Sequence, residues 1–160
     1  MAAVEKRIAE LGLVLPAAAL PPGVTLPFPW VRLRANRAYA SGHGALTADG
    51  TMAGPFGKVP TEVSLEQAQE SAVNAVLALI GSVQRALGNL DRVGAWLTVT
   101  GCVNADSGYP QTTAVFNPAS ELIHSIFGSD RGQHARTALG YATLPFNVPV
   151  IVAAELEIAS

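Results

Sequence analysis

The stretch 64–87 constrains the fold most, because its apolar residues recur at helical spacing throughout. Ser64 and Gln67 form the pattern of a capping box at its start, and Gly88 supplies a stop after its end. From Val93 the apolar period changes to two, which is typical of a strand. A long helix that passes directly into a strand predicts a domain of the α+β class.

The other elements follow from the same periods and from the positions of proline and glycine. In chain order we expect a helix over 2–12, an extended arm over 16–29, strands over 30–35 and 37–42, the helix over 64–87, a strand over 93–102, a helix over 117–128, and strands over 135–143 and 149–158. Alternation along the strand 93–102 places Trp96 on the face opposite Val99, and both faces lack charge, which indicates cover on both sides. We expect a single domain over 1–160, in which a helix and arm (1–28) precede a core (29–160), with one sheet that carries both long helices on one face.

The composition indicates self-association. Of the 160 residues, 49% are hydrophobic and 14% are charged, which is more apolar than an average soluble domain. No apolar stretch is long enough to cross a bilayer. Burial of apolar surface between copies of the chain is the simplest explanation for this high apolar content, so we expect a homo-oligomer.

The charge balance and the N-terminal residues argue against nucleic acid and membrane as partners. A net charge of −2 offers no electrostatic basis for nucleic acid binding, and the basic cluster Arg32, Arg34 and Arg37 is interpreted as a solvated strand face. Residues 1–14 mix charged and apolar side chains, which predicts an amphipathic helix rather than a signal peptide. The one cysteine, Cys102, suits a reducing compartment. We therefore expect a cytoplasmic protein.

Arg136 is the first candidate for a binding residue, because it stands near the start of a strand that is otherwise nearly uncharged. An arginine keeps its charge and is costly to bury alone, so a partly enclosed one needs an anionic partner. Its planar fork grips carboxylates with two parallel hydrogen bonds, which favours a small acid as ligand. A structural ion pair with a glutamate of this chain or of a neighbouring copy remains the alternative.

The sequence holds no pattern for metal, cofactor or covalent catalysis. No phosphate-binding loop follows the glycines around His43, and His43, His124 and His134 lack paired metal-ligand spacing. No serine lies in a nucleophile elbow, and Cys102 lies in mid-strand, as inert buried thiols do. Any chemistry would therefore proceed without metal, cofactor or covalent nucleophile.

An ordered set of short motifs resembles a known family along nearly the whole chain. These are residues 5–8, 11–12, 40–43, 57–59, 64–67, 87–93, 100–101, 103–104, 116–117, 127–128, 134–136, 144–145 and 148–150. The chain resembles the reactive intermediate deaminase (Rid, or YjgF) family, and within it the chorismate-mutase-like branch labelled as endoribonucleases.

The resemblance implies a homotrimer with a barrel-like centre, one mixed sheet per subunit, helices outside, and clefts between subunits. In active members, the arginine that matches Arg136 holds the carboxylate of a 2-imino acid while water attacks the imine carbon, giving a 2-keto acid and ammonia. Imines hydrolyse readily, so positioning and electrostatic assistance supply most of the catalysis. No cofactor is implied.

Three further positions match residues of the family's cleft. Phe28 matches a tyrosine that lines it, so it retains the ring without the hydroxyl. Gly42 matches a glycine whose backbone approaches the ligand, and Asn117 matches an asparagine near the cleft. From the sequence alone, Asn117 is equally an N-cap of its helix, and Gly42 a bend in its strand.

One departure puts the family's activity in doubt. Deaminating members carry a glutamate on the last strand, thought to position or activate the water, and the matching residue here is Ile151. His43 replaces a common glutamine and could handle a proton, with a hydrogen bond in the cleft wall as the alternative. The leading hypothesis is a carboxylate-binding protein with weak deaminase activity or an unfamiliar substrate. A non-catalytic metabolite-binding module comes second, and an endoribonuclease comes third because of the acidic balance.

Overall fold

The computed structural model describes residues 2–18 and 25–159. Five strands form one mixed sheet in the order β1-β2-β5-β3-β4. β3 and β4 pair in parallel, and every other neighbouring pair is antiparallel. The strands are β1 (Val31–Arg34), β2 (Arg37–His43), β3 (Val93–Asn104), β4 (Ala135–Tyr141) and β5 (Val150–Ile158).

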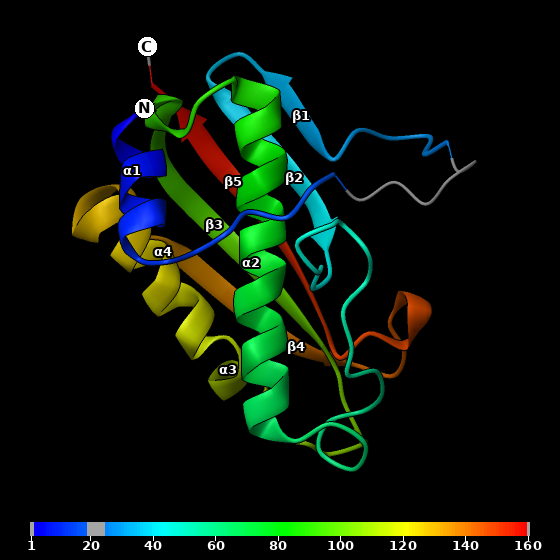
Figure 1. Cartoon of the computed structure of the whole chain (residues 1–160). Helices are drawn as coiled ribbons and strands as arrows, with labels where there is room; N and C mark the ends of the chain where they lie inside the picture. The colour runs from blue at the N-terminus through cyan, green and yellow to red at the C-terminus, as the bar shows by residue number, and fades with distance from the viewer. Residues whose placement is uncertain (1, 19–24, 160) are drawn as a thin grey trace.

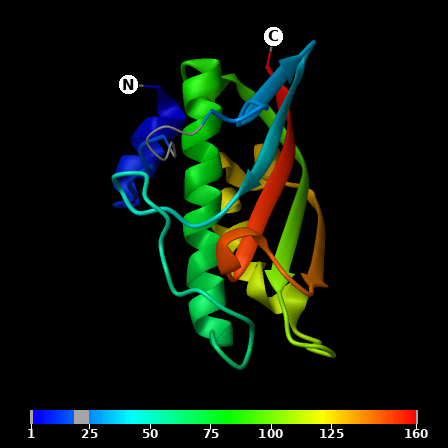
Figure 2. The same ribbon diagram turned by 90° about the vertical axis from the view of Figure 1, so that its right-hand side faces the viewer.

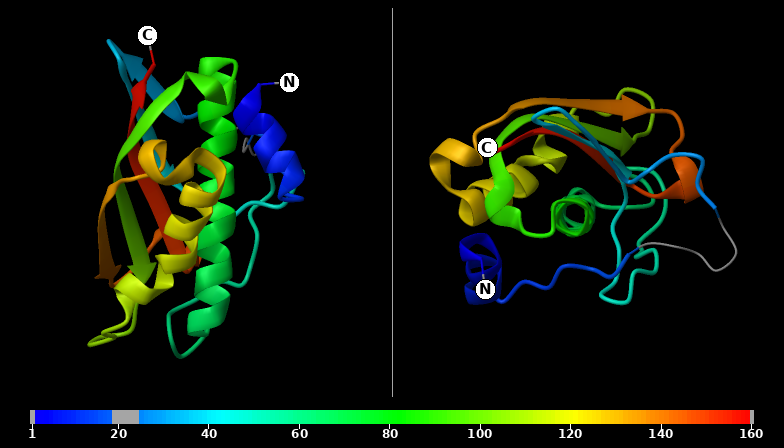
Figure 3. Two further views of the ribbon diagram at one scale, coloured as in Figure 1. Left: turned by 90° about the vertical axis from the view of Figure 1, so that its left-hand side faces the viewer. Right: turned by 90° about the horizontal axis from the view of Figure 1, so that it is seen from above.

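The helices gather on one face of this sheet (Figures 1 and 3). They are α1 (Ala3–Glu10), α2 (Leu65–Leu87), α3 (Thr112–Val115) and α4 (Asn117–Arg131), with 3-10 turns η1 (Leu90–Arg92) and η2 (Pro145–Asn147). α2 crosses the middle of the sheet, and α4 lies beside it (Figure 1). The prediction of an α+β fold with both long helices on one face of a mixed sheet is confirmed.

The ends of α2 follow the sequence signals. The Ser64 hydroxyl accepts a hydrogen bond from the Gln67 backbone N–H (3.2 Å), and the Gln67 side chain accepts one from the Ser64 N–H (3.0 Å), which completes the capping box. Gly88 ends the helix at φ 86°, a conformation that glycine adopts without strain. Between these ends the helix buries its small and aliphatic side chains against β2 and β5.

A bulge in β3 corrects one expectation. The register with β5 shifts between Trp96 and Thr98, and an extra residue of this kind reverses the alternation of side chains. Trp96 therefore lies on the helix side together with Val99, each 2% exposed, and its ring meets Phe127 edge-on at 5.6 Å. The prediction that Trp96 faces away from Val99 is wrong.

Within the described residues, no helix covers the other face of the sheet, which we call the open face (Figure 2). Its β1–β2 end carries charged side chains, including the exposed Arg32 and Arg34 and an Arg37–Glu155 ion pair at 2.5 Å. The rest forms an uncharged patch: Thr98, Thr100, Cys102, Thr137, Leu139, Tyr141, Ile151 and Ala153. This chain alone thus covers its central strands on one side, not on both as expected.

The N-terminal segment matches its prediction in part. α1 is shorter than the expected helix and packs against η1 and α4. The expected arm over 16–29 falls partly on residues 19–24, outside the described residues. Among the helices described, none has the length and apolar character needed to span a membrane.

Candidate functional site

Arg136 projects from edge strand β4 toward the start of α4. In register, it pairs with Val99 of β3, whose buried side chain faces the helices, so Arg136 lies on the helix side of the sheet. Its Nη1 donates to the Ser120 hydroxyl (3.0 Å), and its Nη2 donates to Asn117 Oδ1 (2.8 Å) and to the Thr113 carbonyl (3.2 Å). Three oxygens from α3 and α4 hold the guanidinium in place.

All three of these oxygens are neutral. In the part of the chain that the structure describes, no carboxylate lies within 4.0 Å of the Arg136 guanidinium. Partial burial lowers the pKa of Arg136, although the group stays charged. An ion pair with a glutamate of the same chain, one of the alternatives left open by the sequence, is not formed among these residues, so the positive charge remains available to an anion.

The Asn117 side chain hydrogen-bonds Arg136 and does not cap its own helix. α4 begins at Asn117, its N-cap is Phe116, and no side-chain capping bond is made there. The Asn117 amide oxygen instead accepts from Arg136. The N-cap interpretation is therefore wrong, because the parallel pairing of β4 with β3 brings the arginine over the first turn of α4.

His134 joins the site through a residue that the sequence patterns did not single out. Ser120 Oγ accepts from Arg136 and lies 2.9 Å from His134 Nε2, while His134 Nδ1 donates to the Gly132 carbonyl (2.7 Å). Because Nδ1 carries the ring proton, the Ser120 hydroxyl donates its proton to His134 Nε2. Burial first, then the charges of His124 and Arg136, lower the pKa of His134, against an opposing effect of its backbone hydrogen bond. Two spacings signal this cluster: His134 and Arg136 are two apart on an extended segment, and Asn117 and Ser120 are three apart on a helix.

Gly42 and Phe28 lie elsewhere. A side chain at Gly42 would place its Cβ 2.8 Å from Ile151 Cγ2, so this glycine permits close contact between β2 and β5. Phe28, 49% exposed, meets Trp30 edge-on at 6.2 Å, and Ser41 is hydrogen-bonded to Pro29 and Trp30. Phe28 and Gly42 thus share one region, and Ile151 adjoins it.

His43 lies beneath α2, in the core. It is 3% exposed, its Nδ1 donates to the Ser41 carbonyl (2.6 Å), and its Nε2 lies 2.9 Å from Ser82 Oγ. Arg85 Nη2 donates to the same hydroxyl (3.1 Å). Burial lowers the pKa of His43 to about 4, and the nearby Arg85 charge acts in the same direction, against the Ser41 hydrogen bond.

The sheet separates the expected site residues into two groups. Ile151 pairs with Cys102, which is three residues from Val99 and hence on the opposite face from Arg136. β5 and β3 also stand between β2 and β4. Arg136 and Asn117 are therefore brought together within one chain, whereas Gly42, Phe28 and His43 lie apart from them.

Comparisons with known proteins cover nearly the whole chain. Protein TCP17 of Trypanosoma cruzi is 31% identical over 155 residues, which cover 97% of this chain and 94% of that protein. The structure of Atu1372 from Agrobacterium tumefaciens, a protein of unknown function, superposes with a TM-score of 0.85 at 31% identity, covering 97% of this chain and 92% of the other. No family model matches the chain.

More distant structures share the fold. A candidate endoribonuclease from Shewanella oneidensis gives a TM-score of 0.85 at 23% identity, over 96% of this chain and 98% of its own. YyfA from Yersinia pestis, a protein of the Rid family, gives 0.58 at 14% identity, over 90% and 97%. The chain thus belongs to the family of TCP17 and Atu1372, and its mixed sheet with helices on one face is the fold of the Rid/YjgF proteins.

Proposed function

We propose that the protein binds small carboxylates, 2-imino or 2-keto acids, through Arg136 in a cleft between subunits, and that it hydrolyses 2-imino acids slowly. The observation that carries this proposal is a guanidinium held by three neutral oxygens, with no carboxylate of the described residues beside it. These bonds use three of the five guanidinium N–H donors, so Nε–H and one Nη1–H remain for a carboxylate, and a side chain already held in place loses little entropy on binding one.

The division of the site across the sheet supports an assembly of subunits. Arg136 lies on the helix side of an edge strand, whereas Gly42 and Ile151 meet at the opposite face. A cleft lined by both groups requires residues of two chains. The uncharged patch of the open face, where Leu139 is 51% and Tyr141 43% exposed, offers the surface that a homotrimer would bury.

The proposed reaction needs one water. Water adds to the imine carbon, its oxygen forms the new C–O bond, and the imine nitrogen takes a proton. The hydroxyl proton of this carbinolamine is then transferred to nitrogen as the C–N bond breaks and the C=O bond forms, releasing ammonia and the 2-keto acid. Arg136 holds the carboxylate and offsets its charge, while His134 is a titratable group hydrogen-bonded to the same serine as Arg136.

A non-catalytic binding module is the second candidate, and Ile151 favours it. This half-buried side chain cannot activate water at the position where deaminating members carry a glutamate. Such a module would bind 2-keto acids and leave imine hydrolysis at its spontaneous rate.

One experiment separates the two functions. An amino-acid oxidase generates the imine in situ, and release of 2-keto acid is followed with wild-type protein, Arg136→Met, Ile151→Glu and no protein. The proposed function predicts acceleration by wild type, none by Arg136→Met, and a faster rate with Ile151→Glu. If wild type gives the spontaneous rate but binds 2-keto acids in calorimetry, the binding module stands. If wild type neither binds nor accelerates, both functions are excluded.

Asn117→Ala tests how Arg136 is held. It keeps the charge but removes one of the three oxygens, so we expect carboxylate affinity to fall by about tenfold, against about a hundredfold for Arg136→Met. Affinity measured by calorimetry with pyruvate is the readout. Equal affinity of Asn117→Ala and wild type would show that the amide does not position the arginine.

A further inference from the structure

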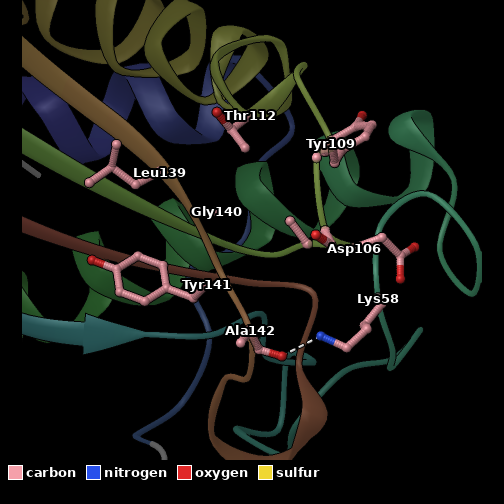
Figure 4. A pocket seen from close by; sticks show the side chains of 11 residues that line it. Lys58, Asp106, Tyr109, Thr112, Leu139, Gly140, Tyr141 and Ala142 are labelled. Carbon is pink, nitrogen blue, oxygen red and sulfur yellow. Dashed lines mark hydrogen bonds between the residues drawn. The ribbon is translucent and has the colours of Figure 1, made fainter.

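A second cation, Lys58, lies at the far end of β4 and lines a pocket of about 660 Å³ (Figure 4), and it has no anionic partner among the residues at 2–18 and 25–159. The Lys58 ammonium donates to Asn104 Oδ1 (3.1 Å) and to the carbonyl oxygen of Ala142. An ammonium has three donors, and these two neutral acceptors leave one of them unused. Among the described residues, no carboxylate lies within 4.0 Å of the Lys58 nitrogen.

Two carboxylates of this region, Glu62 and Asp106, accept hydrogen bonds from other groups. Glu62 Oε2 accepts from the backbone N–H of Lys58 (2.7 Å), which fixes the loop but leaves the ammonium unpaired. Asp106 lines the pocket, yet its Oδ2 accepts from both the backbone N–H (3.2 Å) and the hydroxyl (2.6 Å) of Thr61. Asp106 keeps its negative charge but is turned to Thr61, so Lys58 supplies the positive charge of this pocket.

A buried amide orients the lysine. Asn104 is 1% exposed, and its Nδ2 donates to Asn147 Oδ1 (3.1 Å), which turns its own Oδ1 toward the ammonium. The Asn104 backbone N–H donates to Pro149, and its carbonyl accepts from Val59 (2.9 and 2.8 Å). Every polar group of Asn104 is used, so the position of the ammonium is set before any ligand arrives.

We propose that Lys58, oriented by Asn104, binds a small oxyanion in this pocket, as a site separate from that of Arg136. Ala142 follows Arg136 by six residues of extended chain, about 20 Å, so one small molecule cannot reach both cations. The loop 105–109 and Thr112 form one wall, and residues 139–142 form the other. The pocket has the size of small-molecule sites, and a carboxylate and a phosphate present the same charged oxygens to the lysine.

The test measures anion binding in a protein that lacks the first site. In Arg136→Met protein, kept in its native oligomeric state, the amide NMR signals are followed during titration with inorganic phosphate and, separately, with acetate. We expect saturable shifts centred on residues 140–142 and 105–108. The probe that gives them identifies the chemistry of the ligand. Absence of shifts with both probes, or shifts confined to other residues, would overturn the proposal, including the case in which assembly closes the pocket.

Two substitutions at the lysine complete the test. Adding Lys58→Met to the Arg136→Met protein should weaken binding at least tenfold, whereas adding Lys58→Arg should keep it within threefold. Unchanged binding with Lys58→Met would refute the role of the charge. The titration of the Arg136→Met protein decides the matter by itself if Lys58→Met does not fold. Because these measurements do not involve imine hydrolysis, their result is independent of the proposed function.

Discussion

Acid should destabilise this protein through His43, because burial in the folded core favours the neutral form of this ring. His43 Nδ1 donates to the Ser41 carbonyl, and Ser82 can donate its hydroxyl proton to Nε2 while accepting from Arg85. Protonation would add a proton on Nε2, turn the Ser82 hydroxyl away, and bury a second cation beside Arg85. The low pKa, about 4, expresses this cost, with burial as its largest cause.

The magnitude follows from linkage. The pKa of this histidine falls from 6.5 in the unfolded chain to about 4 in the folded one, so below pH 6.5 the unfolded state binds the extra proton. The stabilisation is complete above pH 6.5 and is lost as the pH falls toward 4. At about 1.4 kcal/mol per pKa unit, the full loss is roughly 3 kcal/mol, of which about 2.5 kcal/mol falls between pH 7 and pH 4.5.

Urea unfolding at pH 7 and pH 4.5, at one protein concentration, measures this loss. His43→Gln cannot titrate, so its decrease in unfolding free energy over this interval should be smaller than that of wild type by about 2.5 kcal/mol. The pKa of His134 is also lowered, and this histidine is present in both proteins, so its contribution cancels. His134→Gln is the matched control and should retain the His43 contribution. Parallel pH profiles for wild type and His43→Gln would refute the reasoning.

Three further outcomes are expected. A Cβ at Gly101 would lie 2.5 Å from ring atoms of the fully buried Phe116, so Gly101→Ala should lower the free energy of unfolding by about 2–3 kcal/mol and Tm by about 5–10 °C in calorimetry. Gly44→Ala, whose Cβ would lie 3.8 Å from the nearest side-chain atom, should leave Tm unchanged. Equal Tm values for the two variants would contradict this. Leu139→Glu places a charge in the uncharged patch and should reduce the mass in light scattering to that of a monomer, whereas Leu11→Glu should not; an unchanged mass would exclude the patch as an interface. Purified wild-type protein should leave single-stranded RNA intact in a gel assay, because the net charge is −2; cleavage that tracks the protein through every purification step would contradict this.

Local patterns in the sequence sufficed for the five strands and for α1, α2 and α4, but not for the short helix α3, and they identified one side of the site. The capping box at Ser64 and the helical period that follows specify α2 without any distant partner, because their hydrogen bonds and apolar spacing lie within a few residues. Arg136 was identifiable as a charge on an otherwise uncharged strand. The family motifs placed Asn117 near the cleft, and in the structure its amide oxygen accepts from Arg136.

Tertiary structure decided which residues contact Arg136, Trp96 and Lys58. Ser120 and Thr113 hold Arg136 because parallel pairing with β3 sets β4 beside α3 and α4, and no local pattern encodes that register. The side taken by Trp96 depended on a bulge opposite β5, a property of two strands and not of one. Asn104 meets Lys58 across 46 residues of chain. Spacing thus determined the long elements and the apolar face of α2, whereas long-range packing determined the side taken by Trp96 and which polar side chains share a site.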